Sequence, residues 1–285
     1  MRLGSWLNSL QSKVTRNVHA SDRRSRRRRQ TPVAREIHEL ETRTLLAAVS
    51  WDGGGGDFNW SNAVNWSGDA LPGASDDVTI DFGANDFSVV HGAGTDSIRS
   101  LTSSASLTVA GGELFVSANS TIAGDLTLAA TFGGFGDITV SGTFTWNNGT
   151  LQGVNGAGRL TANGGTLIAG AATLAGGFDY TNPQGNLATW TTGINVNVGG
   201  GSTFENAGTL DLQTDAGLGS EADGSAFINS GTLTKTGGNP DRNHFSGSLF
   251  HADEMLNTGA IDIQVGTFAW AGRPDEGDSC DLPAK

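Results

Sequence analysis

The chain has 285 residues with 43 Gly and 6 Pro, and its formal net charge at pH 7 is −12. Residues 1–46 hold 11 basic and 4 acidic residues, a net charge of +7, whereas residues 47–285 hold 6 basic and 25 acidic residues, a net charge of −19. This acidic body repels phosphate and disfavours nucleic acid as a partner, and the regular apolar alternation within it argues against a Gly-rich disordered chain.

Simple counts exclude two further classes of protein. Cys280 is the single cysteine, so the chain forms no internal disulfide and has no cysteine-based metal site. No apolar run approaches the length of a transmembrane segment. The sequence leaves the oligomeric state open.

Residues 1–46 form a basic leader that we predict to be mostly disordered. Its centre is the run Arg26-Arg27-Arg28-Arg29, which suits either a nucleic-acid or nuclear-localisation patch or the positive region of an export signal. Downstream, Leu40-Glu41-Thr42-Arg43-Thr44-Leu45-Leu46 resembles the Leu-Glu-Pro-Arg-x-Leu-Leu segment near the start of many large planctomycete surface proteins, with Thr42 in place of Pro. The resemblance favours the export reading and implies a destination at the cell surface or outside the cell.

Residues 47–82 form a distinct module rich in Trp and Gly. Its sequence features, in order, are Trp51-Asp52-Gly53-Gly54, Trp60, Asn65-Trp66, Pro72 and Asp76-Asp77-Val78-Thr79-Ile80. This order and spacing resemble the opening segment of bacterial autotransporter-like and other exported β-helix proteins. We therefore expect an N-terminal cap, after which Val78 and Ile80 begin the first coil.

The three Trp residues of this module have two interpretations. A solenoid end exposes unpaired strand edges and an open apolar core, which Trp51, Trp60 and Trp66 can cover. We favour this cap, because large aromatic side chains are more often buried than displayed. The alternative is a carbohydrate site, in which the faces of the same three rings stack on sugars.

A seven-residue pattern recurs in the second half of the chain and predicts stacked coils. It reads apolar, any residue, Asn, small, Gly, Thr or Ala, apolar, and its copies begin at Phe204, Phe227 and Met255. Such a repeat cannot bury its apolar face alone and must stack on its neighbours. We expect the turn Asn and Gly residues to be architectural, with the Asn amides hydrogen-bonded along the stack and the turns using left-handed conformations. These residues are Asn163, Asn182, Asn206, Gly208, Asn229, Gly231, Asn257 and Gly259.

Weaker copies of short alternating strands occupy residues 83–200, as in Leu107-Thr108-Val109 and Leu126-Thr127-Leu128. They resemble the solenoids of filamentous-haemagglutinin-like and passenger-domain adhesins. We therefore predict an all-β fold, a right-handed parallel β-helix over residues 83–270 with about 20–25 residues per coil. Residues 271–285 are predicted to be a disordered tail.

Motifs for metals and catalysis are weak. Asp57 and Asp137 stand one residue too early in their Gly-rich runs for the nonapeptide calcium repeat. A surface calcium site at Asp76, Asp77 and Asp81 is a minor alternative that no motif supports, and we expect no cofactor. Parallel β-helices also occur in polysaccharide lyases and hydrolases, and carboxylates such as Asp211 and Asp262 would align on successive coils.

The sequence thus favours an exported or cell-surface β-solenoid with a structural or adhesin-like role and no catalytic activity. Its expected partners are extracellular glycans or cell-surface components. The alternatives are a glycan-binding module and a degenerate polysaccharide lyase or hydrolase. Fold by itself does not decide between these functions.

Overall fold

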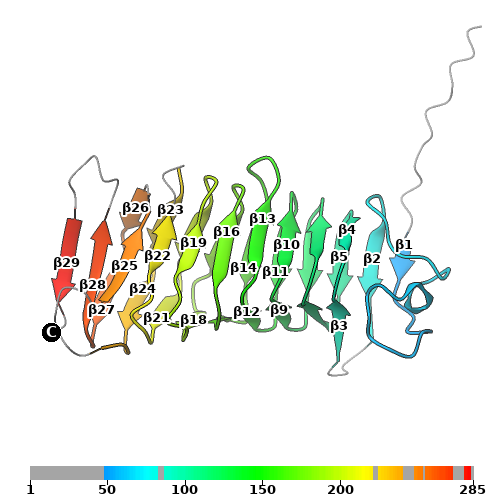
Figure 1. Ribbon diagram of the computed structural model, residues 1–285, viewed down its shortest axis with the longest axis horizontal. Helices are drawn as coiled ribbons and strands as arrows, with labels where there is room; N and C mark the ends of the chain where they lie inside the picture. Colours follow the sequence, from blue (N-terminus) through cyan, green and yellow to red (C-terminus); the bar gives the residue numbers. More distant parts are fainter. Residues whose placement is uncertain are drawn as a thin grey trace, which may run out of the picture. The chain divides into compact units, whose positions relative to one another are not determined.

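The computed structural model describes residues 48–82, 87–220, 224–239, 247–252, 254–271 and 279–283. This part of the chain is an all-β solenoid. The one helix among the described residues is a short 3₁₀ helix, η1 (Ala63–Asn65). The predicted leader, residues 1–46, lies outside the described residues. The predicted fold class is confirmed: strands of successive coils stack in parallel along the body (Figure 1).

The described strands form three sheets of 10, 9 and 10 strands, and every strand pair is parallel except β28 with β29. Sheet 1 contains β1 (Ala48–Ser50), β2 (Asp77–Ile80), β5 (Ser100–Ser103), β8 (Ser120–Ile122), β11 (Asp137–Val140), β14 (Arg159–Ala162), β17 (Asp179–Asn182), β20 (Thr203–Asn206), β23 (Ala226–Asn229) and β26 (Glu254–Asn257). Sheet 2 contains β3 (Ser88–His91), β6 (Ser106–Val109), β9 (Leu126–Leu128), β12 (Phe144–Trp146), β15 (Thr166–Ile168), β18 (Leu187–Trp190), β21 (Thr209–Leu212), β24 (Thr232–Lys235) and β27 (Ala260–Ile263). Sheet 3 contains β4 (Thr95–Ile98), β7 (Glu113–Val116), β10 (Thr131–Gly134), β13 (Thr150–Gly153), β16 (Ala172–Ala175), β19 (Val196–Val198), β22 (Leu218–Ser220), β25 (Gly247–His251), β28 (Thr267–Ala271) and β29 (Ser279–Pro283).

Each coil contributes one strand to each sheet, and the recurring sequence pattern sets the register between coils. Phe204 pairs with Phe227, and Phe227 pairs with Met255, so the three copies of the pattern are stacked in phase. From β2 onward, the spacing of paired residues in sheet 1 varies from 18 residues, between Ser120 and Ile138, to 28 residues at the last pair. The predicted repeat is therefore one coil, and the length differences are absorbed between the strands.

Alternate residues of each strand point into a continuous apolar core. In its C-terminal half the core contains aromatic rings from successive coils. The ring centroids of Tyr180 and Phe204 are 4.7 Å apart, those of Phe204 and Phe227 are 5.8 Å apart, and those of Phe227 and Phe250 are 4.8 Å apart. All four side chains are fully buried. Removing one such ring typically costs about 3–5 kcal/mol of stability.

A ladder of Asn side chains runs along the inner edge of sheet 1, as the sequence predicted. Nδ2 of Asn182 donates to Oδ1 of Asn206 at 2.8 Å, Asn206 donates to Asn229 at 2.7 Å, and Asn229 donates to Asn257 at 2.7 Å. The first three side chains are fully buried, whereas Asn257 is exposed. The buried amides of Asn206 and Asn229 are satisfied by their ladder neighbours on both sides, in the manner of stacked Asn in cross-β structures.

The prediction that Asn163 belongs to this ladder is wrong. Thr161 pairs with Thr181, which places Ala162 opposite Asn182 and leaves Asn163 one residue further on, exposed in a turn. The ladder therefore begins at Asn182, whose Oδ1 accepts no hydrogen bond from any described residue. The 19-residue spacing in the sequence looked like one coil, but this coil is 20 residues long.

The left-handed backbone conformation predicted for the turn Asn and Gly residues is wrong. None of the ladder Asn residues, nor Gly208, Gly231 or Gly259, has a positive φ. Glycine is required at these positions because the turns of successive coils approach one another closely. A Cβ on Gly231 would lie 2.0 Å from the carbonyl oxygen of Gly208, and one on Gly259 would lie 2.0 Å from that of Gly231. The turns stack too tightly for any side chain at this position.

The N-terminal end of the solenoid is covered as predicted. Strand β1 pairs with β2 and covers the first edge of sheet 1. On sheet 2, the amide of Trp60 donates to the carbonyl of Val90 at 2.9 Å, and the amide of Val90 donates to the carbonyl of Phe58 at 2.8 Å. The segment from Phe58 to Trp60 thus occupies the edge of β3. These contacts remove strand edges that would otherwise promote association with other chains.

The predicted boundaries at the two ends of the solenoid shift. Strand β2 is already part of the first coil, so the segment that covers the end of the solenoid is residues 48–76 of the predicted cap 47–82. Within the predicted disordered tail, 271–285, strand β29 (Ser279–Pro283) pairs antiparallel with β28. The polar composition of that segment gave no strand signal.

Candidate functional site: the outer face of sheet 2

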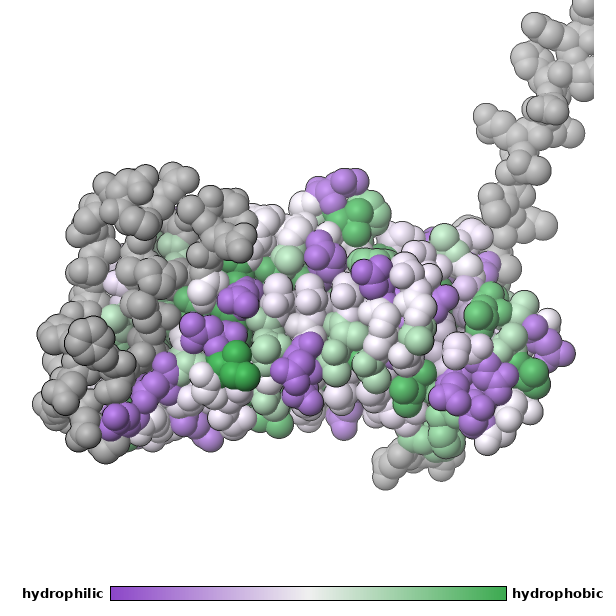
Figure 2. Space-filling model, in the orientation of Figure 1, coloured by the Kyte–Doolittle hydropathy of each residue, from purple (hydrophilic) through white to green (hydrophobic). Residues whose placement is uncertain are grey.

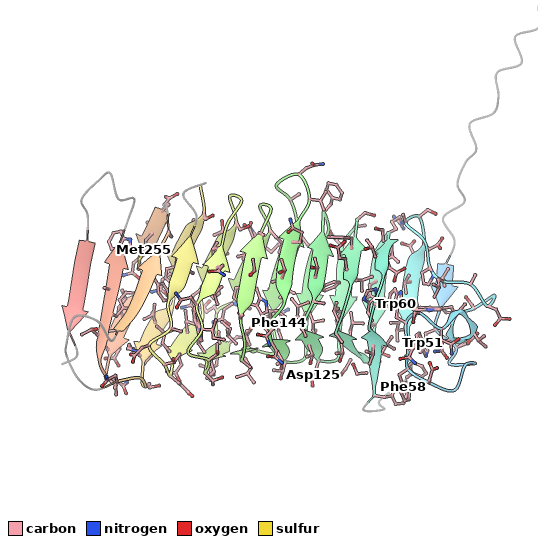
Figure 3. All side chains as sticks on the ribbon, viewed as in Figure 1. Trp51, Phe58, Trp60, Asp125, Phe144 and Met255 are labelled. Atoms are coloured by element: carbon pink, nitrogen blue, oxygen red, sulfur yellow. The ribbon has the colours of Figure 1, made fainter. Side chains whose placement is uncertain are left out.

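The three Trp residues of the cap are buried and form one cluster. Their exposed fractions are 5% for Trp51 and 0% for both Trp60 and Trp66. Trp66 lies edge-on to Trp51 at 4.8 Å and to Trp60 at 4.7 Å, and its Nε1 donates to the carbonyl of Trp60 at 2.7 Å. Figure 3 places Trp51 and Trp60 at the N-terminal end of the solenoid. These rings present no face on which a sugar can stack, so the predicted glycan contacts at these three residues are wrong.

A polar network around Asp57 holds the loop of the cap. The Asp57 carboxylate accepts hydrogen bonds from the Asn59 amide at 2.9 Å, Asn65 Nδ2 at 2.8 Å and Asn62 Nδ2 at 3.0 Å. Oδ1 of the buried Asn65 accepts from the Gly55 amide at 2.9 Å. The hydrogen bond from the Asn59 amide, with those from Asn65 and Asn62, lowers the pKa of Asp57 from its ordinary 3.8 to about 2.

This network predicts that acid opens the cap before the coils. Because the pKa of Asp57 is lower in the folded protein, its stabilisation is complete above about pH 4 and is lost as the pH falls towards 2. Hydrogen exchange measured by mass spectrometry between pH 5 and 2 should show early loss of protection in residues 51–66. Asp57→Asn should weaken protection at neutral pH and flatten this pH dependence.

The matched control for this prediction is Asp137→Asn, because that exposed carboxylate on β11 receives no hydrogen bond in the described structure. Its exchange profile should follow the wild type at each pH. Loss of protection in central coils before the cap would contradict the assignment.

Every Lys and Arg in the described ranges is paired with an aspartate. Arg99 bonds to Asp77, Arg159 to Asp179 at 3.1 Å, and the fully buried Lys235 to Asp215 at 2.9 Å. The hydrogen bonds from Arg99 and Ser100 lower the pKa of Asp77. The described surface therefore offers no unpaired cation to a phosphate, sulfate or uronate.

The acidic residues proposed as a calcium site are each held by the protein. Asp76 accepts from the Gly73 amide at 2.7 Å, Asp77 bonds to Arg99, and Asp81 accepts from Ser104 at 2.8 Å. In the described part of the chain, no group of three or more His, Cys, Asp or Glu residues is arranged to hold a metal ion.

The carboxylates considered for catalysis do not lie on successive coils. Asp211 pairs with Thr234, and Thr234 pairs with Asp262, so a threonine stands between the two acids. Asp211 accepts hydrogen bonds from Thr236 at 2.6 Å and Gln213 at 2.8 Å, and Asp262 accepts from Gln264 at 3.0 Å. Asp211 and Asp262 are therefore two coils apart, and the predicted alignment on successive coils is wrong.

The outward faces of the strands carry straight rows of small polar side chains. In sheet 1 one row consists of threonines in register over six coils, because each strand places Thr at the same position. These are Thr79, Thr102, Thr121, Thr139, Thr161 and Thr181. On the face shown in Figure 2, weakly polar residues are interspersed with hydrophilic ones and hydrophobic residues are scattered.

The outer face of sheet 2 is hollowed near the cap. A shallow pocket of about 310 Å³, which we call the Phe87 pocket, lies over β3, β6 and β9. Its lining combines one aromatic residue, one carboxylate and several hydroxyl side chains. The lining residues are Phe87, Ser88, Ser106, Leu107, Thr108, Asp125 and Thr127.

A second hollow continues along the same sheet. This pocket, which we call the Leu187 pocket, has a volume of about 340 Å³, lies over β15 and β18, and reaches Thr143 immediately before β12. Thr143, at one side of it, donates its amide proton to Asp125 Oδ1 at 2.7 Å, so the two pockets adjoin. Leu187 is 51% exposed and forms part of its lining.

An aromatic cluster, exposed at Phe58 and partly buried at Phe82 and Phe87, flanks the Phe87 pocket. Phe58 stacks on Phe87 with ring centroids 4.9 Å apart and an interplanar angle of 25°, and Phe87 meets Phe82 edge-on at 4.4 Å. Phe58 is 46% exposed. In Figure 3, Phe58 and Asp125 both lie along the side of the body formed by sheet 2. The sequence reasoning missed this cluster, because Phe58 and Phe87 come from different modules and meet through the pairing of the cap with β3.

Comparison with known proteins yields no relative: no protein-family model, curated protein or solved structure matches this chain. Among the described residues, no helix has the length and apolar character needed to cross a membrane.

Proposed function

We propose that this protein is an exported or cell-surface β-solenoid with a structural or adhesin-like role. The observation that carries the proposal is the uninterrupted stacking of parallel coils, capped at the N-terminal end, with rows of threonine and other polar side chains facing outward. Backbone hydrogen bonds and an inward apolar stack make such a body stiff, and its repeated faces offer extended surfaces to partners.

The sequence of the leader supports the location in this proposal. The basic run at Arg26–Arg29 and the segment from Leu40 to Leu46 resemble the start of exported surface proteins. The acidic composition of residues 47–285 suits an exterior rich in cations, where like charges are screened.

The test is the location and adhesion of the full chain. An antibody against it should label intact source cells before permeabilisation, and beads coated with it should adhere to those cells or their extracellular matrix. Labelling that appears after permeabilisation and not before would contradict export. Surface labelling without bead adhesion would leave a structural role and remove the adhesive one.

A further inference from the structure

We propose that the outer face of sheet 2 binds a neutral linear polysaccharide, which lies along the solenoid axis across the Phe87 and Leu187 pockets. The inference rests on the proposed function and names the ligand class of an adhesive surface. The glycan site proposed here is on the outer surface of the solenoid, whereas the Trp residues first considered for sugar binding are buried.

The Phe87 pocket combines an aromatic wall with hydroxyl groups. A pyranose ring has an apolar face of C–H groups and a rim of hydroxyls, so it needs an apolar plate with polar groups beside it. Phe87, stacked on Phe58, supplies the plate. The volume of about 310 Å³ lies at the small end of ligand pockets, about 300–1,000 Å³.

The polar groups of this pocket retain capacity for a ligand. Asp125 Oδ1 accepts from the Thr143 amide, while its Oδ2 has no protein donor in the described structure. The Thr127 hydroxyl, two residues further along the chain, likewise has no hydrogen-bond partner among the described residues. A carboxylate oxygen and a hydroxyl of this kind can accept from and donate to the hydroxyls of a sugar.

The two adjoining pockets give the ligand its length and direction. Strands β3, β6, β9, β12, β15 and β18 are consecutive neighbours in sheet 2, so the pockets span five strand spacings. At about 4.8 Å per spacing the groove is roughly 24 Å long. Leu187 and Leu167 provide apolar surface in its second half. This length fits an oligosaccharide segment better than a single sugar.

Charge selects the class of polysaccharide. Arg99, Arg159 and Lys235 are each paired with an aspartate, and none lines either pocket. Asp125 places a carboxylate in the groove, which repels uronates and sulfated sugars. Neutral chains of hexoses or N-acetylhexosamines avoid this repulsion and can still donate to Asp125.

The experiment uses the full chain on an array of neutral linear glucans, mannans, xylans, galactans and chitin oligosaccharides, with polygalacturonate as the anionic comparator. We expect binding to at least one neutral hexamer, weaker binding to its dimer, and none to polygalacturonate. Phe87→Ala and Asp125→Asn should each weaken hexamer binding about tenfold in calorimetry. Thr234→Ala is the matched control, because Thr234 occupies the same outward register position in sheet 2 as Thr127 but lies outside both pockets, two coils beyond β18. It should bind as the wild type does.

The outcomes separate this inference from the proposed function. A chain that reaches the cell surface and adheres, but binds no neutral glycan on the array, overturns the pocket and leaves the function standing. Binding that survives Phe87→Ala, Asp125→Asn and the milder Thr127→Ala also overturns it. Preference for polygalacturonate would refute the charge argument.

Discussion

Replacing Trp60 with Ala should lower the free energy of unfolding by about 3–5 kcal/mol, with the cap opening first. The ring is fully buried, and its centroid lies 4.7 Å from that of Trp66 and 5.9 Å from that of His91. His91 is itself buried, with Nε2 2.9 Å from Asp96 and Nδ1 2.8 Å from the carbonyl of Gly111. Loss of the Trp60 ring therefore leaves a cavity beside the buried His91 ring, whose partner Asp96 is partly exposed, and admits water to it.

Trp60→Phe is the matched control for this prediction. It keeps most of the apolar area and removes an indole Nε1 that has no hydrogen-bond partner among the described residues, so it should cost less than about 2 kcal/mol. Hydrogen exchange resolved by peptide, together with denaturant unfolding, measures both variants. Equal losses from the two substitutions would mean that the cavity is not the cause.

The position of the damage matters as much as its size. In a solenoid each coil contacts its neighbours, so stability is close to a sum of coil and interface terms. The Trp60→Ala variant should lose protection in residues 51–80 while coils around Phe204 and Phe227 retain it. Uniform loss along the body would show that the solenoid unfolds as one cooperative unit.

The sequence predicted those parts of the fold that depend on repetition. Copies at Phe204, Phe227 and Met255 share one spacing of apolar, Asn and Gly residues, and parallel stacking is the arrangement that buries all three in the same way. The cap was predictable for a related reason, because an open stack of coils needs a cover and the Trp residues are the bulkiest side chains near its start.

Other features escaped the sequence because they depend on coil length or on contacts between modules. Because one coil is a single residue longer than the apparent period, Ala162 and not Asn163 lies opposite Asn182. The sheet 2 groove arises from Phe58 in the cap, Phe87 before β3 and Asp125 before β9, and no local motif links these residues. Outward side chains carry little periodic signal, so binding faces are harder to predict than cores.

Replacing Asn206 with Ala should destabilise the C-terminal coils by about 2–4 kcal/mol. Asn206 accepts from Asn182 and donates to both Asn229 Oδ1 and the carbonyl of Thr232, at 2.7 and 3.1 Å. Without it, buried Asn229 keeps an acceptor with no donor and Asn182 loses its neighbour in the ladder. The ladder is thus interrupted at a point where water cannot replace the missing amide.

Asn257→Ala tests whether burial is the cause, because Asn257 occupies the same ladder but is exposed. Water can take over its bond to Asn229, so this change should cost less than about 1 kcal/mol. Denaturant unfolding with hydrogen exchange over residues 182–263 measures the difference. A cost for Asn257→Ala equal to that of Asn206→Ala would show that the amide chain acts cooperatively along its length, whereas negligible costs for both would show that the apolar stack alone holds the coils in register.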